Sequence, residues 1–144
     1  MEPRISLVTL GVSDLARSRA FYESLGWIGQ EIEETVFVQA GGLALVLWGA
    51  GKLAADAGVG SPPTDHSGGI VLAHNVRARQ EVDSVMDEAL QAGATITKPP
   101  TETAYGGYAG CFVDPDGHAW EIAFNPGFPI APDGSLTLPD FGER

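Results

Sequence analysis

The most informative segment of the chain is Asp114-Pro-Asp-Gly-His-Ala-Trp-Glu-Ile-Ala-Phe124. Its Pro-Asp-Gly tripeptide is typical of a turn, and the apolar residues that follow predict a short strand over 119–124. Side chains alternate along a strand, so Glu121 shares one face with Ala119 and Ala123, while the larger apolar side chains point the other way. A lone carboxylate in such a strand is expected to be paired or to have a perturbed pKa. We therefore expect any chemistry of this chain to take place near Glu121.

Beyond this strand, the same order of elements occurs twice along the chain. Alternating apolar residues indicate strands, and apolar residues at helical spacing followed by glycine indicate helices. The first set comprises a strand over 5–12, a helix over 15–25 and strands over 29–33, 35–39 and 43–48. The second set comprises a strand over 69–76, a helix over 79–92 and strands over 94–98, 110–114 and 119–124. Two matched sets of five elements predict a duplicated module.

The chain of 144 residues is predicted to be one α+β domain. The first module covers about 4–50 and the second about 69–126, and a Gly-, Ala-, Pro- and Asp-rich linker that could contain one helical turn covers about 51–68. A Pro- and Gly-rich tail follows over 127–144. Each module should have a curved mixed sheet with a helix on one side only. Pairing of the two bare sides would enclose a cleft of the kind that binds small molecules.

Composition excludes some classes of partner. The chain has 19 acidic and eight basic residues and a net charge of −11, so a nucleic-acid partner, which depends on clustered Lys and Arg, is not expected. The acidic surplus favours solubility, or else attracts a cationic ligand. No apolar run is long enough to cross a membrane, and the N-terminus lacks the pattern of a signal peptide. The single cysteine, Cys111, cannot form an intrachain disulfide. We expect a cytoplasmic protein without a membrane partner.

Several segments occur in a characteristic order. These are Val8-Thr-Leu-Gly-Val-Ser-Asp-Leu-Ala-Arg-Ser-Arg-Ala-Phe-Tyr22 near the N-terminus, Tyr105-Gly-Gly-Tyr108 and Phe112-Val-Asp-Pro-Asp-Gly-His118 in a late hairpin, and Trp120-Glu-Ile122 in the closing strand. In this order and spacing they resemble the vicinal oxygen chelate superfamily, which includes glyoxalase I, bleomycin-resistance proteins and extradiol dioxygenases. The resemblance extends from residue 4 to about 126. It implies paired βαβββ modules around a cleft, usually in a homodimer.

The resemblance also implies a metal site, because enzymes of this superfamily typically hold a divalent metal with His and Glu on the cavity faces of four strands. The matching positions fall near Leu7, within Leu45–Leu47, near Val71 and at Glu121. Only Glu121 is a ligand type, and stable metal sites use several donors. We therefore expect no metal cofactor, unless a divalent metal is held through a replacement ligand such as His74.

The three histidines show no metal-ligand spacing. His74 lies in the predicted strand over 69–76, on the face that should press against a helix, and Asn75 then points to the cleft. A bulge or a one-residue slip would reverse these directions. His118, in a turn, and His66, in the predicted linker, are both expected in solvent.

The residues expected to line a ligand site are Trp48, Asn75, Tyr105, Tyr108 and Glu121. Glycines between the two tyrosines would let the backbone approach a ligand. An aromatic cleft with one carboxylate suits an apolar or cationic ligand, although plain packing would explain the aromatic residues equally well. Glu121 has four possible roles: pocket anion, general base, remnant metal ligand, or acceptor for a tyrosine hydroxyl.

Four functions are compatible with these features. The first is metal-free binding of a small molecule, resembling the bleomycin-resistance branch. The second is a metal-dependent glyoxalase-like lyase or isomerase, or a dioxygenase, and the third is a metal-free acid–base enzyme that uses Glu121 with Tyr105 or Tyr108. The fourth is an inert or partner-binding domain. We favour the small-molecule binder, with Glu121 as the catalytic residue if the chain is an enzyme. We also expect a homodimer, to which the apolar tail could contribute.

Overall fold

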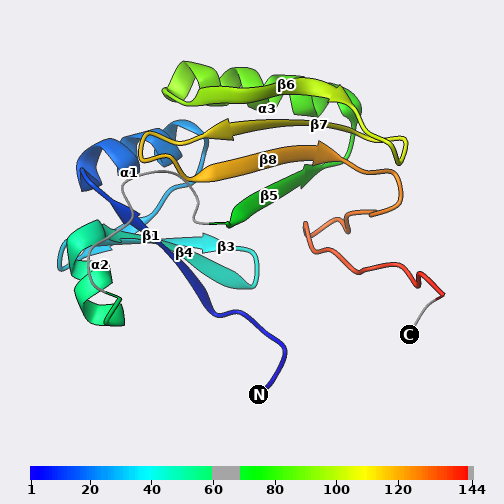
Figure 1. Ribbon diagram of the computed structural model, residues 1–144. Helices are drawn as coiled ribbons and strands as arrows, with labels where there is room; N and C mark the ends of the chain where they lie inside the picture. The colour runs from blue at the N-terminus through cyan, green and yellow to red at the C-terminus, as the bar shows by residue number, and fades with distance from the viewer. Residues whose placement is uncertain (60–68, 143–144) are drawn as a thin grey trace.

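The structure is a computed structural model that describes residues 1–59 and 69–142. Two similar modules are followed by an extended C-terminal tail (Figure 1). The N-terminal module contains β1 (Leu7–Val12), α1 (Leu15–Ser24), β2 (Gln30–Ile32), β3 (Thr35–Ala40) and β4 (Leu43–Gly49), and the helix α2 (Ala50–Ala57) follows it. The C-terminal module contains β5 (Val71–Val76), α3 (Arg79–Ala92), β6 (Thr95–Glu102), β7 (Tyr108–Val113) and β8 (Ala119–Phe124). The predicted repetition of one strand, one helix and three strands is confirmed.

Each module forms its own four-stranded mixed sheet. The strand order is β1-β4-β3-β2 in the N-terminal sheet and β5-β8-β7-β6 in the C-terminal sheet. In both sheets the first strand of the module pairs in parallel with the last, and the other neighbours are antiparallel. The two sheets are separate and do not close into a barrel (Figure 1). The fold class is α+β, as predicted.

The helices begin and end where the local sequence favours it. The Asp14 side chain caps α1 by accepting a hydrogen bond of 3.1 Å from the Arg17 backbone N–H. α3 ends at Gly93, whose φ of 114° is accessible to glycine without strain. Buried Val82 and Met86 lie on the face of α3 that packs against the sheet. No helix in residues 1–59 and 69–142 is long and apolar enough to span a membrane.

One hydrophobic core joins the helix-facing sides of the two sheets. Leu10 and Leu47 contribute to it from the N-terminal sheet, and Phe112 and Trp120 from the C-terminal sheet. The helix α1 contacts both sides, because it packs on β3 and β4 while its Phe21 ring lies 6.3 Å from the Phe112 ring. The opposite side of each sheet, here called its bare face, therefore points away from this shared core.

The helix α2 has eight residues and lies almost entirely in the segment that was expected to be a linker with one helical turn. It packs over one end of the N-terminal bare face, where a Cβ on Gly11 would lie 3.1 Å from the Ala50 Cα. The absence of a side chain at Gly11 thus allows the helix to approach β1 closely. The remainder of the expected linker, residues 60–68 with His66, lies outside the described residues.

The tail after β8 folds back on itself. Ile130 and Leu136 form an isolated antiparallel bridge. The Arg77 guanidinium donates a hydrogen bond of 2.8 Å to the Ala131 carbonyl, which fixes the tail beside the end of β5. Further along, Leu138 and Phe141 are exposed apolar side chains.

Candidate functional site

The bare face of the C-terminal sheet collects side chains from several strands. Directly paired residues point to the same side of a sheet, and Glu121 pairs with Ala73 of β5 and Cys111 of β7. Counting by twos from these pairs gives the residues of this face on the three strands: Val71, Ala73, Asn75, Ala109, Cys111, Val113, Ala119, Glu121 and Ala123. Most of these side chains are small, and Glu121 carries the one charge among them.

Glu121 is half-buried, and its carboxylate has no hydrogen bond or ion pair with any described residue. The hydroxyls of Tyr22 and Tyr108, one of which could have been its donor, bond to Asp114 and Asp83 instead. A partly desolvated carboxylate without a protein partner favours the approach of a cation or a hydrogen-bond donor. Glu121 is therefore available to a ligand.

Cys111 lies directly beside Glu121 on β7. Burial raises the pKa of the Cys111 thiol above its ordinary value of 9.0, and the negative charge of Glu121 acts in the same direction, while Lys98 opposes both. The thiol is therefore protonated at neutral pH and adds no charge to the face.

Lys98 is a residue of this face that the sequence reasoning missed. It pairs with Cys111 across β6 and β7, so its side chain emerges on the bare face. Cys111 thus lies between Glu121 on one side and Lys98 on the other. The pairing of β6 shifts register on both sides of Lys98, between Ile96 and Lys98 and again before Thr101. Counting by twos along the sequence cannot foresee such shifts.

The other expected ligand-binding residues are dispersed. Asn75 pairs with Ala123 on the same bare face as Glu121, so these two expected residues do lie together. Trp48 pairs with Gly11 and belongs to the bare face of the other sheet. Tyr105 lies in the loop between β6 and β7 and is 54% exposed.

Tyr108 points to the helix-facing side of the C-terminal sheet, opposite to Glu121. Its hydroxyl donates a hydrogen bond of 2.8 Å to Asp83 of α3, and the Arg79 guanidinium lies 5.1 Å from its ring centre. The hydrogen bond to Asp83 raises the pKa of the Tyr108 hydroxyl above its ordinary value of 10.0. Tyr108 thus takes part in packing α3 onto β7, and an acid–base pair of Glu121 with Tyr108 is not formed. The sequence placed the start of this strand at 110, two residues late, which left Tyr108 in a loop.

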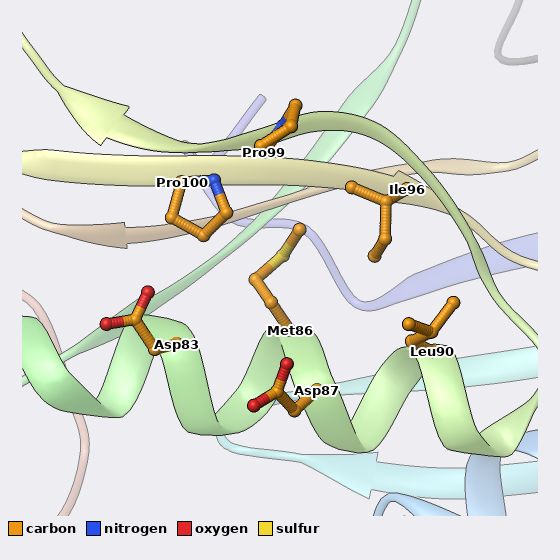
Figure 2. Close-up of a pocket in the computed structure, with 7 residues that line it drawn as sticks. All are labelled: Asp83, Met86, Asp87, Leu90, Ile96, Pro99 and Pro100. Atoms are coloured by element: carbon orange, nitrogen blue, oxygen red, sulfur yellow. The ribbon is translucent and has the colours of Figure 1, made fainter.

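A groove of about 130 Å³ lies on this same helix-facing side, between α3 and β6 (Figure 2). Its lining comprises Asp83, Met86, Asp87, Leu90, Ile96, Pro99 and Pro100. Gly110 of β7 lies against it, because a Cβ there would be 3.0 Å from the Met86 Cε and 3.1 Å from the Pro100 Cγ. The groove contains none of the five expected ligand-binding residues and is separated from Glu121 by the sheet.

His74 faces the helix side, as predicted. It lines a cavity of about 70 Å³ together with the rings of Tyr22, Trp27 and Trp120. Partial burial lowers the pKa of the imidazole below its ordinary value of 6.5, although the charge of Glu81 opposes this. His74 and Glu121 therefore lie on opposite sides of the sheet and cannot bind one metal ion together.

The positions that the resemblance assigns to metal ligands all lie on the bare faces. Leu7 and Val46 are on the N-terminal bare face, and Val71 and Glu121 are on the C-terminal one. Three of the four side chains are aliphatic. In residues 1–59 and 69–142 no group of three or more His, Cys, Asp or Glu side chains could hold a metal ion. The donors in the described chain therefore do not fit a divalent metal site of the implied kind, which needs at least three protein ligands.

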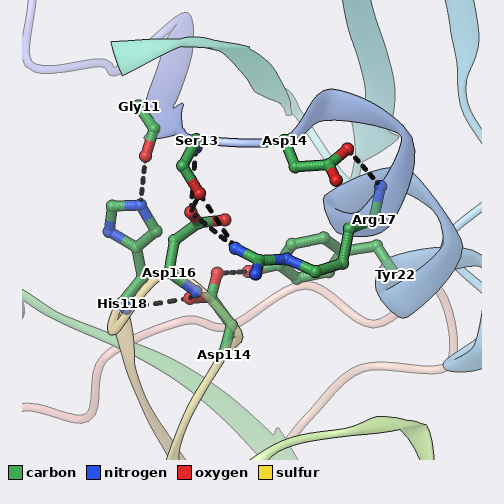
Figure 3. A network of polar contacts seen from close by, with 8 residues as sticks. All are labelled: Gly11, Ser13, Asp14, Arg17, Tyr22, Asp114, Asp116 and His118. Atoms are coloured by element: carbon green, nitrogen blue, oxygen red, sulfur yellow. Dashed lines mark hydrogen bonds and ion pairs between the residues drawn. The ribbon is translucent and has the colours of Figure 1, made fainter.

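The Pro-Asp-Gly turn that opens β8 binds the start of α1 (Figure 3). One carboxylate oxygen of Asp116 accepts hydrogen bonds from the Ser13 backbone N–H at 2.9 Å, the Ser13 hydroxyl at 2.8 Å and the Arg17 guanidinium at 3.2 Å. Because Ser13 and Arg17 belong to the N-terminal module, this turn connects the two modules. Its residues have a structural role at this end of the sheet.

His118 belongs to the same turn, and its expected exposure to solvent is wrong. Its side chain is half-buried, and its Nε2 lies 2.8 Å from the carbonyl oxygen of Gly11 (Figure 3). The backbone N–H of His118 donates a hydrogen bond of 2.9 Å to Asp114. A turn usually projects into water, but this one is covered by the other module.

The chain is similar to several proteins of known structure. A glyoxalase-related enzyme from Fulvimarina pelagi is 41% identical, with a TM-score of 0.87 over 96% of this chain and 99% of that one. A glyoxalase/bleomycin resistance protein/dioxygenase family enzyme from Burkholderia phytofirmans PsJN is 23% identical, with a TM-score of 0.71 over 83% and 96% of the two chains. A lactoylglutathione lyase from Agrobacterium tumefaciens is 18% identical, with a TM-score of 0.64 over 86% and 95%. The last two likenesses concern the fold alone.

A sequence comparison with curated proteins gives no match. The family model of the Glyoxalase/Bleomycin resistance protein/Dioxygenase superfamily, in contrast, matches residues 4–122 and so covers both modules. This range includes the Pro-Asp-Gly turn and Glu121. Together with the duplicated βαβββ architecture, the match shows that the chain belongs to the Glyoxalase/Bleomycin resistance protein/Dioxygenase superfamily.

Proposed function

We propose that the chain binds a small organic molecule on the bare face of the C-terminal sheet, with Glu121 as its anionic contact. The observation that carries this proposal is the half-buried Glu121 carboxylate, which has no partner among the described residues. Keeping a partly desolvated charge without a partner costs free energy, which a cationic group of a ligand would offset. The neighbouring alanines leave space above the backbone for that group.

Binding without a metal is supported by the aliphatic residues at the other implied ligand positions. Leu7 and Val71 offer no donor atom, and Val46 is buried. Of the three, Val71 lies on the same bare face as Glu121, where it suits contact with the apolar part of an organic molecule better than the coordination of an ion. This favours a binder of the bleomycin-resistance kind over a metal-dependent enzyme.

The binding proposal is tested by calorimetric titration with organic cations such as benzyltrimethylammonium and n-hexylammonium. Binding to the wild type should be at least about fivefold weaker in Glu121→Gln, which keeps the shape of the side chain and removes its charge. Glu88→Gln is a matched control, because Glu88 lies on α3, on the other side of the sheet. Equal affinities of wild type and Glu121→Gln for every cation would refute the role of Glu121.

We further propose that a second copy of the chain covers the bare faces. Support comes from the exposed apolar side chains on them: Leu7 is 54% exposed, Phe37 37% and Val71 58%. Apolar groups of this size gain free energy when they are removed from water, and two open sheets could enclose a cleft between copies. Sedimentation equilibrium at micromolar concentration should give a dimer, and a monomer alone would refute the proposal.

A metal-free enzyme is the second candidate function. It is favoured by the 41% identity to a protein described as a glyoxalase-related enzyme. In this case Glu121 acts as the general base, since it is a carboxylate with no competing partner among the described residues. The Glu121→Gln variant would then lose turnover but keep its fold. A metal-dependent enzyme would instead require at least one equivalent of Mn, Fe, Ni or Zn in purified protein.

The cytoplasmic location stays a prediction.

A further inference from the structure

The bare face of the C-terminal sheet carries two opposite charges that do not neutralise each other. Glu121 on β8 and Lys98 on β6 are each one strand away from Cys111 on β7. Neighbouring strands are about 4.8 Å apart, so the backbones that bear the two charges are about 10 Å apart. Neither side chain forms an ion pair with any residue in 1–59 or 69–142. The face therefore presents an acid and a base with a gap between them.

Cys111 lies between Glu121 and Lys98 but does not bridge their charges. Its side chain is short, and its thiol stays protonated because burial and the neighbouring Glu121 both raise its pKa. Both Glu121 and Lys98 influence this thiol electrostatically, which agrees with their positions on either side of it in the strand pairing. The surface between the two charges is thus small, uncharged and suited to an apolar spacer.

We propose that the ligand of this face is a zwitterion whose ammonium group binds Glu121 and whose carboxylate binds Lys98, with a short apolar chain between them over Cys111. This inference rests on the proposed function and names the class of its ligand. A ligand with only a cationic group would leave Lys98 without a counter-charge, whereas a zwitterion satisfies both side chains at once. The chain between the two charges of the ligand must be long enough to cross Cys111. An α-amino acid is then too short, and an ω-amino acid with four to six carbons has the required reach.

The experiment is a titration of the full chain, followed by ¹H–¹⁵N NMR, with 6-aminohexanoate, n-hexylammonium, hexanoate and glycine. We expect 6-aminohexanoate to bind about threefold or more tightly than the other three probes, because each half-exposed ion pair adds a modest factor to the affinity. The shifts should occur in the amides of β7 and β8. Lys98→Gln should remove the advantage of 6-aminohexanoate over n-hexylammonium. Lys52→Gln is the matched control, since Lys52 is the other lysine of the sequence and lies on α2.

The possible outcomes separate this inference from the proposed function. If n-hexylammonium binds as tightly as 6-aminohexanoate and both depend on Glu121, the zwitterion is refuted and the cation site stands. If the preference for 6-aminohexanoate persists in Lys98→Gln, the role of Lys98 is refuted. If no probe shifts the amides of β7 and β8, both proposals fail.

Discussion

The Tyr22 hydroxyl of α1 donates a hydrogen bond of 2.6 Å to the Asp114 carboxylate at the end of β7 (Figure 3). Both side chains are almost completely buried, at 1% and 3% exposure. The same hydroxyl accepts a hydrogen bond of 3.1 Å from the Trp120 indole. One oxygen atom of the N-terminal module therefore satisfies two buried polar groups of the C-terminal module. This makes the contact a specific link within the apolar core that the modules share.

Tyr22→Phe should destabilise the protein strongly. The substitution keeps the ring but leaves the Asp114 carboxylate oxygen and the Trp120 N–H without their partner in the core. Each buried group that loses its hydrogen bond costs about 1–3 kcal/mol, so the two groups together should cost about 2–6 kcal/mol of the free energy of unfolding. Urea denaturation followed by tryptophan fluorescence measures this loss.

Tyr108→Phe is the matched control for this substitution. It also removes a tyrosine hydroxyl that is bonded to an aspartate, but the Asp83 partner is exposed and water can replace the donor. The expected loss is below about 1 kcal/mol. Equal losses in the two variants would contradict the proposed importance of the link between modules.

The stability of the protein should fall in alkaline solution because of Tyr22. Burial, and then the charge of Asp114, raise the pKa of the Tyr22 hydroxyl far above its ordinary value of 10.0. The folded protein thus holds the proton more tightly than the unfolded chain. The stabilisation by the protonated Tyr22 hydroxyl is complete below pH 10. Above that value the free energy of unfolding declines by about 1.4 kcal/mol per pH unit for this one proton. Unfolding free energies measured between pH 9 and 11.5 should show a steeper decline in the wild type than in Tyr22→Phe. Parallel curves would contradict the assignment.

The fold could be predicted from the sequence to a large extent, because it depends on local signals. The helix over 79–92 and the strand over 119–124 have the predicted bounds, since each has a regular apolar pattern with a terminating glycine or a turn. The helix α2 was underestimated, because its segment is short, is flanked by glycines and contains only one large apolar residue, Leu53. The strand β6 continues through Pro99 and Pro100, which is possible because it is an edge strand.

The candidate site could be predicted only in part, because it depends on which strands are neighbours. Alternation along single strands correctly indicated that Glu121 and Asn75 share a side of the sheet and that His74 points to the other. The proximity of Lys98 to Cys111 follows from a pairing with two register shifts, for which the sequence has no periodic signal. The sequence assigned Tyr108 to a loop. In the structure β7 already begins at Tyr108, and the alternation of side chains along this strand points Tyr108 to the side of the sheet opposite to Glu121.

Asp116 should contribute more to stability than its ion pair with Arg17 does. Its side chain is 7% exposed and accepts hydrogen bonds from the Ser13 backbone and hydroxyl, whereas the Arg17 side chain is 48% exposed. We expect Arg17→Met to cost less than about 1 kcal/mol, as for other half-exposed ion pairs. Asp116→Ala should cost about 1.5–3 kcal/mol, because it removes the charged acceptor of the hydrogen bonds from the Ser13 backbone and hydroxyl. Urea denaturation of both variants and of the double variant tests this. A coupling energy as large as the whole effect of Asp116→Ala would mean that the ion pair dominates.

Gly107 should not tolerate even one methyl group. It is buried immediately before β7, and a Cβ there would overlap the Phe124 carbonyl oxygen and lie 2.7 Å from the Tyr105 ring. The Phe124 carbonyl is backbone at the end of β8, so it can move away only by disrupting the sheet. Gly107→Ala should therefore cost at least about 2 kcal/mol, at the upper end of the range for an overpacked site.

Gly51→Ala is the matched control, because Gly51 lies in α2 with open space around it, and alanine there should stabilise the helix by at most about 1 kcal/mol. Thermal unfolding of the two variants should shift in opposite directions, and a neutral Gly107→Ala would show that the loop before β7 can relax away from β8.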